Sequence, residues 1–185
     1  EKRGGDQVVV NIQDQKIQYF GAKTNASAKS SRVSVRINAQ TIRDFIEKSS
    51  NVLIMGHQQA DLDAFGSMVA VMHMARASKK QALLALEEQK CDLTTQKIID
   101  ILRKEVPEYQ QNYVLPEEAI RMMNENSLLI VVDSQSPKIV MSPEVLEKTQ
   151  KLIVIDHHRV GEESFDADFS FIEPYASSTI ELVME

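Results

Sequence analysis

Cysteine is almost missing from this chain of 185 residues, which contains Cys91 and no second one. A single cysteine can form neither an internal disulfide nor a multi-cysteine zinc site, and it fits a reducing compartment. Long apolar runs are missing too, since none approaches the roughly 20 residues that a membrane-spanning helix needs. The opening residues, EKRGGDQ, have neither the layout of a signal peptide nor an initiator methionine. We therefore expect a globular segment of a longer protein.

Basic residues are in the minority. There are 21 Lys and Arg against 27 Asp and Glu, which gives a formal net charge of −6 and a pI near 5.3. A surface of this sign repels polyanions, so we expect no binding of long nucleic acids. A ligand that carries phosphate would need a local counter-charge, and a metal ion could supply it. The hydrophobic content of 43% is enough to fill the core of one domain.

The first 50 residues differ in pattern from the rest. The runs QVVVNI and KIQYFG, on either side of a polar turn at 13–15, predict a β-hairpin with a glycine turn at 4–6 before it. The small, polar stretch AKTNASAKSS predicts a linker. An amphipathic connecting helix is expected from about Asn38 to Ser49. Its apolar residues at helical spacing are Ile42, Phe45 and Ile46.

From Asn51 onward, short apolar runs alternate with helical segments. The expected strands are NVLIM, ALLAL, SLLIVV, KLIVI and a weaker DFSFI. The expected helices are 63–77, 94–105, one that begins near Pro116, a short one at 143–148, and one that begins at serines 177 and 178. Strands that are apolar throughout and separated by helices are typical of an α/β fold, with a mainly parallel sheet covered by helices on both faces.

Three of the expected strands lead directly to acidic and imidazole side chains. These residues are His57, Asp61 and Asp63 after the first strand, Asp133 after SLLIVV, and Asp156, His157 and His158 after KLIVI. The carboxyl ends of parallel strands share one edge of a sheet, and ligands bind there near a topological switch point. We therefore expect these residues to converge on one site.

Four carboxylates at one site would repel one another and take up protons unless a cation were present. Oxygen and imidazole ligands without thiolates favour manganese, iron, cobalt, zinc or magnesium, and manganese is our first expectation. His57 and Asp61 could face one ion and Asp63 a second, with Asp133 as the bridge. Two ions about 3.5–4 Å apart clamp an in-line attack at phosphorus. Phosphoester hydrolysis is therefore the predicted reaction.

Simpler interpretations exist for several of these residues. Asp63 could be the N-cap of its own helix, and Asp133, before SQSP, could be a turn former. His73 lies inside a predicted helix without an acidic neighbour, so we expect it on the surface or in packing. The methionines of the same helix should be core residues. They are Met68, Met72 and Met74.

The segments GHQQADLDAFGS, VVDSQSP and VIDHHR, in this order, resemble the motifs of the DHH phosphoesterase superfamily, named for a motif present here as Asp156-His157-His158. The upstream stretch from RGGDQVVV to YFGAKTNASAKSSRV resembles the end of the degenerate GGDEF domain found in GdpP-type cyclic-di-AMP phosphodiesterases. The resemblance implies three parts. These are a GGDEF remnant at 1–37, a connecting helix at 38–50 and a DHH domain at 51–185.

The resemblance also implies an activity and roles for residues. Enzymes of this type hydrolyse cyclic di-AMP to 5′-pApA with two Mn²⁺ ions, and we expect a membrane-anchored homodimer with this segment in the cytoplasm. His158, with Arg159, would contact the substrate phosphate, and Asp156 would orient a neighbouring histidine from behind. The implied ligands are His57, Asp61 and Asp133 for the first ion, and Asp63, Asp133 and His157 for the second.

Two parts of the family pattern have no counterpart here. The second ion takes a further aspartate from a fourth motif, and Asp166 and Asp168 come too soon after the third motif to supply it. The DHH-associated domain, which helps to bind the nucleotide, is absent as well. We expect the segment to be inactive alone. Two alternatives stay open: a DHH enzyme acting on short oligoribonucleotides or pyrophosphate, and a non-catalytic module that senses a metal or a nucleotide.

Overall fold

The computed structural model describes residues 7–10, 18–21, 27–134, 136–159 and 164–185. It divides the chain into two units, Glu1–Ala39 and Gln40–Glu185. The boundary falls inside the first helix, so each unit contains part of that helix.

The first unit contains the predicted β-hairpin. Strands β1 (Gln7–Val10) and β2 (Gln18–Gly21) pair antiparallel, with Val8 opposite Phe20. The turns expected at 4–6 and 13–15 lie outside the described residues.

Helix α1 (Ser27–Lys48) is longer than the connecting helix expected from the sequence. It begins at Ser27 rather than near Asn38, so the predicted linker AKTNASAKSS is wrong from Ser27 onward. The physical reason is that neither glycine nor proline occurs between these bounds, while alanine, lysine and arginine favour a helix. The small polar residues that suggested a linker are therefore tolerated inside a helix.

The second unit alternates strands and helices as expected. Its elements are β3 (Val52–Met55), α2 (Leu62–Ala77), β4 (Ala82–Ala85), α3 (Leu93–Glu105), β5 (Tyr113–Val114), α4 (Pro116–Met122), β6 (Leu128–Val132), α5 (Pro143–Lys148), β7 (Leu152–Asp156), β8 (Phe169–Ile172) and α6 (Thr179–Met184), with 3-10 turns η1 (Glu88–Lys90) and η2 (Pro107–Asn112). The predicted helices begin within two residues of these bounds. Strand β5 was not predicted, because two residues are too short to show a pattern.

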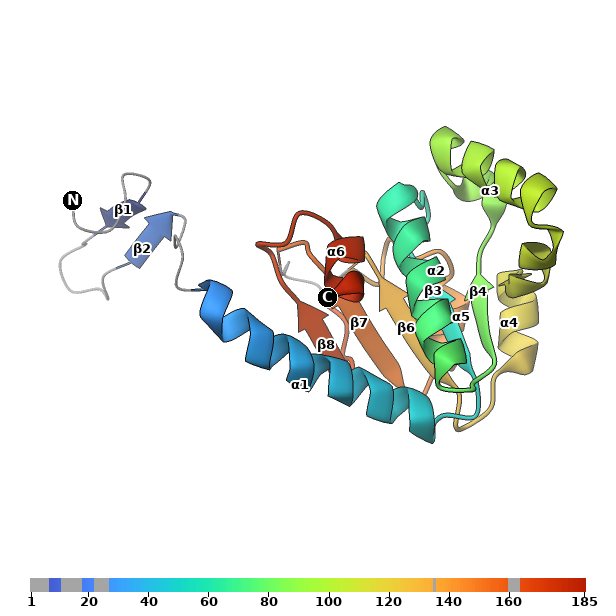
Figure 1. The fold of residues 1–185 in the computed structure, drawn as a ribbon, viewed down its shortest axis with the longest axis horizontal. Coiled ribbons are helices and arrows are strands. Elements are labelled where there is room, and N and C mark those ends of the chain that lie inside the picture. The colour runs from blue at the N-terminus through green and yellow to red at the C-terminus, as the bar shows by residue number, and fades with distance from the viewer. Residues whose placement is uncertain (1–6, 11–17, 22–26, 135, 160–163) are drawn as a thin grey trace. The chain divides into compact units, whose positions relative to one another are not determined.

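The six strands of this unit form one sheet in the order β5-β4-β3-β6-β7-β8 (Figure 1). Every neighbouring pair is parallel. Counted along the chain within the sheet, the order is 3-2-1-4-5-6, which is that of a doubly wound sheet. The direction of winding reverses between β3 and β6, so the topological switch point lies between these two strands. The predicted α/β class is confirmed.

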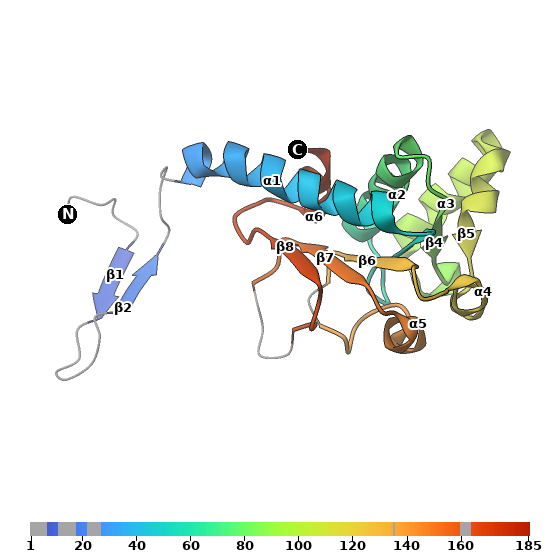
Figure 2. The same ribbon diagram turned by 90° about the horizontal axis from the view of Figure 1, so that it is seen from below.

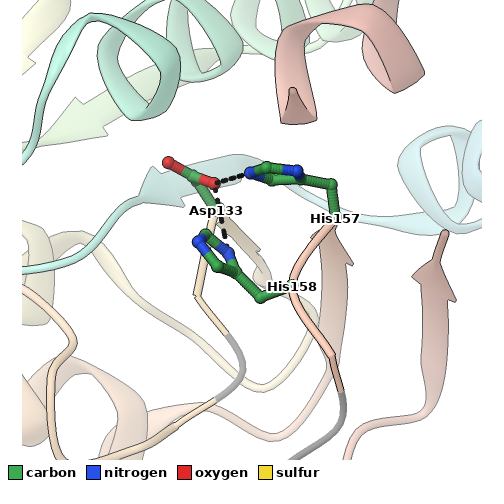
Figure 3. A group of neighbouring side chains, drawn as sticks. All are labelled: Asp133, His157 and His158. Carbon is green, nitrogen blue, oxygen red and sulfur yellow. Dashed lines mark ion pairs between the residues drawn. The ribbon is translucent and has the colours of Figure 1, made fainter. Parts of the chain in front are cut away.

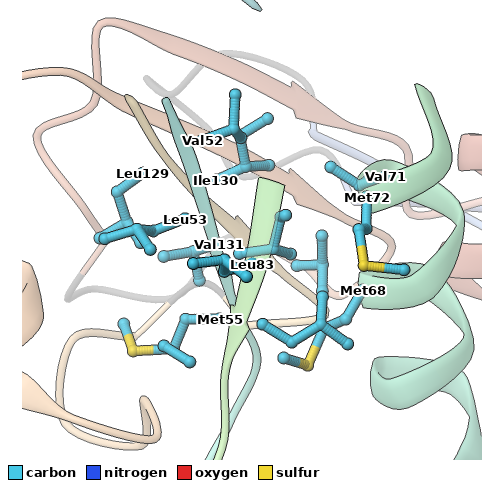
Figure 4. Packing of buried hydrophobic residues seen from close by; sticks show 14 of the residues in the cluster. Val52, Leu53, Met55, Met68, Val71, Met72, Leu83, Leu129, Ile130 and Val131 are labelled. Atoms are coloured by element: carbon cyan, nitrogen blue, oxygen red, sulfur yellow. The ribbon is translucent and has the colours of Figure 1, made fainter. Parts of the chain in front are cut away.

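Helices cover both faces of the sheet. Helices α2 and α6 pack against each other on one face, and α5 lies on the other (Figure 2). Strands β3, β4, β6 and β7 are buried along their whole length. Met68, Val71 and Met72 of α2 are fully buried and point toward the sheet (Figure 4). The methionines predicted for the core are confirmed there, with Met74 partly buried against it.

Two further side chains with potential chemistry, His73 and Cys91, are not among the residues predicted for the site. His73 is exposed on α2, where its Nε2 atom contacts the hydroxyl of Tyr109. Cys91 is buried, and burial raises the pKa of its thiol to about 11, which makes it a poor nucleophile. No helix among the described residues is long and apolar enough to cross a membrane.

Truncation of Ile130 should test the core. This residue is completely buried in β6 and pairs with Ile54 and Ile153 on the neighbouring strands. We expect Ile130→Ala to lower the free energy of unfolding by about 2–5 kcal/mol in urea, because it leaves a cavity between two rigid layers. The control Leu93→Ala, at a side chain that is 74% exposed, should change it by less than about 0.5 kcal/mol. Equal losses would contradict the described core.

Candidate metal centre

The loop after β3 holds His57 at the switch point. The amide of Met141 donates to the Gly56 carbonyl at 2.9 Å, and the amide of Gln58 donates to the Ile139 carbonyl at 2.7 Å. These bonds join the loop to the segment that follows β6, with His57 opposite Val140. The backbone around His57 is therefore held by the segment after β6 as well as by β3, and the His57 side chain is 20% exposed.

Asp133 directly follows β6 and is only 3% exposed. Its φ is 56°, in the left-handed region that few residues other than glycine adopt and that aspartate tolerates better than most. Its amide donates to the Ile155 carbonyl of β7 at 2.9 Å, so this backbone conformation is fixed by the neighbouring strand. Backbone strain of this kind is concentrated at functional sites.

The Asp133 carboxylate lies among three imidazole nitrogens. Its Oδ2 atom is 3.6 Å from Nε2 of His57. Its Oδ1 atom is 3.6 Å from Nε2 of His157 and 3.6 Å from Nδ1 of His158 (Figure 3). The two carboxylate oxygens therefore face two different groups of potential ligands.

These separations fit a metal centre. A distance of 3.6 Å is too long for a hydrogen bond, but two atoms that each bind one ion at about 2.1 Å lie roughly 3–3.6 Å apart. Among the residues that the structure describes, two sets of side chains have ligand atoms within 4.8 Å of one another. They are His57, Asp61 and Asp133 in one set, and Asp133, His157 and His158 in the other. Asp133 belongs to both sets, as a bridging carboxylate must.

Asp61 has a structural role beside its place in the first set. It is the N-cap of α2, where its Oδ1 atom accepts from the amides of Asp63 at 2.9 Å and Ala64 at 3.0 Å. The same Oδ1 atom lies 4.0 Å from Nε2 of His57. The alternative that made Asp63 the cap of this helix is therefore wrong, because the cap lies two residues earlier.

Asp63 points instead to the beginning of α6. Its Oδ2 atom accepts from the amide of Thr179 and its Oδ1 atom from the amide of Ile180, both at 2.8 Å. Its Oδ2 atom is also 3.7 Å from Nε2 of His157. Asp63 is therefore placed on the side of the site where Asp133 faces His157.

Asp156 is completely buried at the end of β7 and organises the two histidines that follow it. Its Oδ1 atom accepts from the amides of His157 at 2.8 Å and His158 at 3.2 Å, and it lies 2.7 Å from Nδ1 of His158. The two imidazole rings lie 4.4 Å apart at 53°. The His158 side chain is 58% exposed, and Arg159 beyond it is exposed too.

The electrostatics of the site favour a cation. The neighbouring Asp133 carboxylate raises the pKa of His57 above its usual value, although burial opposes this effect. Burial acts to raise the pKa of Asp133, but contacts with His57 and Thr179 lower it below its usual value. Burial acts to lower the pKa of His158, and the contact with Asp156 raises it overall. Positive charge is thus stabilised on both sides of Asp133.

Sequence reasoning missed Thr179. This residue is completely buried, and its hydroxyl donates to Oδ1 of Asp133 at 2.8 Å. It lies 46 residues beyond its partner and belongs to no metal-ligand pattern. The one signal near it was the pair of serines that predicted a helix start, and Ser178 is indeed the N-cap of α6.

The two aspartates rejected as further ligands do lie elsewhere. Oδ2 of Asp168 accepts from the amide of Leu152, the first residue of β7. This contact lies at the amino-terminal end of the strand, whereas the site lies beyond the carboxyl-terminal ends. Asp166 and Asp168 line a separate cavity of about 260 Å³ there. Neither joins the side chains around Asp133.

The fold and the site together define a class: a doubly wound α/β domain with a carboxylate and imidazole centre at its switch point. The chain belongs to the DHH family, because the family described as "DHH family, N-terminal domain" matches residues 51–185. The resemblance recognised in the sequence motifs is thereby confirmed.

Several known proteins are similar to this chain. A membrane protein-large ribosomal subunit bL9 fusion protein of Onion yellows phytoplasma is 42% identical over the whole chain. The cyclic-di-AMP phosphodiesterase GdpP of Bacillus subtilis is 36% identical over 99% of the chain. The chain spans only 22% and 28% of the length of these two relatives. The likeness to GdpP-type phosphodiesterases extends beyond the DHH motifs to the first unit.

A solved structure supports the fold. An exopolyphosphatase-related protein of Bacteroides fragilis superposes with a TM-score of 0.61, over 80% of this chain and 42% of that one. The identity is 22%, so this likeness bears on the architecture alone.

Manganese should stabilise the protein through Asp133. We expect free Mn²⁺ at 100 times its Kd to raise the free energy of unfolding by about 2.7 kcal/mol, measured as a shift in thermal unfolding. Asp133→Ala should abolish this gain, because it removes the ligand common to both sets. His73→Ala should keep it, since His73 lies on α2 beside Tyr109. Equal effects of the two substitutions would mean that the site is misplaced.

Proposed function

We propose that this chain is the DHH domain of a manganese-dependent phosphodiesterase that hydrolyses the second messenger cyclic di-AMP to 5′-pApA. One observation carries the proposal: the two oxygens of the buried Asp133 carboxylate face His57 on one side and His157 with His158 on the other. A carboxylate in this position can serve two ions. Relatives named cyclic-di-AMP phosphodiesterases, which align with nearly the whole chain, support the choice of substrate.

The side chains present fit two ions. The first would be held by His57, Asp61 and Asp133, and the second by Asp63, Asp133 and His157. When bound, such ions activate a water molecule for in-line attack and neutralise charge on the phosphate oxygens. The residues of the chain itself would bind and orient the substrate.

His158 is better suited to substrate than to metal. Its Nδ1 atom lies 2.7 Å from the Asp156 carboxylate, and a nitrogen that donates its proton there is not available as a ligand. The imidazole is nevertheless more than half exposed, so it can reach a phosphate group. Asp156 holds the ring and supports its positive charge, and the exposed Arg159 adds a second cation nearby. We assign His158 and Arg159 to the substrate phosphate on these grounds.

The proposal includes a larger protein around this segment. Residues 1–37 would be the remnant of a degenerate GGDEF domain, joined by the residues 38–50 to the DHH domain at 51–185. The whole protein would be a membrane-anchored homodimer with this part in the cytoplasm, and one relative is named a membrane protein fusion. The segment alone would be inactive, since a fourth-motif aspartate and the associated domain would lie outside it.

The substrate distinguishes this proposal from its alternatives. We expect the purified full-length protein with Mn²⁺ to convert cyclic di-AMP to 5′-pApA, and Asp133→Ala to reduce the rate by at least about 10³-fold, because the attacking water loses its activation. His73→Ala serves as the matched control and should retain the rate. Product would be followed by chromatography, beside pyrophosphate and short oligoribonucleotides as competing substrates.

Each alternative has its own result. If the protein rapidly hydrolyses pyrophosphate or linear oligoribonucleotides and leaves cyclic di-AMP intact, cyclic di-AMP is not its substrate. Binding of cyclic di-AMP without cleavage in the presence of Mn²⁺ would make the protein a sensing module.

A further inference from the structure

A short segment at the beginning of α6 contacts the carboxylates of Asp63 and Asp133 and the imidazole of His157. These groups lie on the side of the site that Oδ1 of Asp133 faces. The Thr179 hydroxyl donates to Oδ1 of Asp133, and the amides of Thr179 and Ile180 donate to the two oxygens of Asp63, all at 2.8 Å. The Ala176 carbonyl lies 3.4 Å from Nδ1 of His157. The residues 176–180, here called the 176–180 segment, therefore reach side chains that stand up to 117 positions away.

Each contact holds the side chain of a potential metal ligand in one orientation. The Asp63 carboxylate accepts one amide on each oxygen, so it cannot rotate without breaking both bonds. A hydrogen bond from Nδ1 of His157 to the Ala176 carbonyl would leave Nε2 as the nitrogen with a lone pair. That Nε2 atom is 3.6 Å from Oδ1 of Asp133 and 3.7 Å from Oδ2 of Asp63.

The 176–180 segment is itself held in place. Thr179 is completely buried and Leu182 nearly so, and α6 packs against α2. Ile180 lies against Gly66 of α2, where an added β-carbon would meet its Cδ1 atom at 3.9 Å. A ligand oriented by a packed element loses less conformational freedom when an ion binds than one oriented by a mobile loop.

The contacts of the segment are restricted to one side of the site. Among the described residues, its hydrogen bonds reach Asp63, Asp133 and His157 but not His57 or Asp61. Its hydroxyl contact to Asp133 uses Oδ1, whereas Oδ2 is the atom that faces His57.

We propose that Thr179 is a positioning residue for the second metal ion. Its hydroxyl and amide orient Asp133 and Asp63, and the 176–180 segment thereby prepares this half of the centre before the ion binds. The inference rests on the proposed function only in requiring that the site binds two ions.

The test is a calorimetric titration of the full-length protein with Mn²⁺. Thr179→Val replaces the hydroxyl by a methyl group of similar size, and we expect it to weaken the second ion about 10–100-fold. The first ion should bind within about twofold of wild type. Thr179→Ser keeps the hydroxyl and should restore the affinity for the second ion to within about threefold of wild type.

A control variant separates this effect from the loss of any hydrogen-bonded threonine hydroxyl. Thr149→Val removes a hydroxyl that donates to the Lys151 carbonyl at 3.2 Å, just before β7 at the opposite edge of the sheet. Both ions should bind this variant as they bind wild type. Thermal unfolding without metal establishes that each variant is folded. If Thr179→Val does not fold, Thr179→Ala replaces it, with the same expected loss.

The outcomes separate the two proposals. If wild type binds two ions and Thr179→Val binds both with unchanged affinity, the positioning role is overturned while the phosphodiesterase proposal stands. The role is also overturned if Thr179→Ser fails to restore the second ion, or if both ions weaken equally. If wild type binds no Mn²⁺, the metal centre itself is wrong, and the phosphodiesterase proposal loses its basis.

Discussion

The burial of the Asp133 carboxylate is the constraint on which the site depends. A carboxylate that is only 3% exposed is costly unless partners compensate its charge, and further carboxylates beside it increase the cost. Its partners are the Thr179 hydroxyl at 2.8 Å and three imidazole nitrogens at 3.6 Å. The arrangement is one in which a cation completes the charge balance, so folding and metal binding are expected to support each other.

The doubly wound sheet explains how such a costly group can be placed. Strands β3 and β6 are neighbours at the switch point, where the connections leave in opposite directions and open the edge of the sheet. His57 follows one strand and Asp133 the other, and β7 beside them brings Asp156. The core of the sheet is apolar and rigid, with Leu53 and Ile130 completely buried. The polar groups are thus concentrated beyond the strand ends and the apolar ones within the strands.

Capping interactions link the site to the helices. Asp61 caps α2, and Asp63 accepts the first amides of α6, so two potential ligands also satisfy backbone donors that helices leave unpaired. These hydrogen bonds restrict the rotation of the two carboxylates, and no additional side chains are needed to hold them. It also joins α2 to α6, which pack on the same face of the sheet.

The sequence by itself determined the class of fold, and it predicted which acidic and imidazole residues lie at the ends of the strands. Apolar runs such as SLLIVV and helical spacing between them are local patterns, and parallel pairing follows from burial on both faces. Acidic and imidazole residues at strand ends are local as well. Only the tertiary structure decided that Asp63 meets the first amides of α6 and that Thr179 meets Asp133. These depend on contacts between segments far apart in the chain, and a local pattern contains no information about which distant donor will reach a given carboxylate.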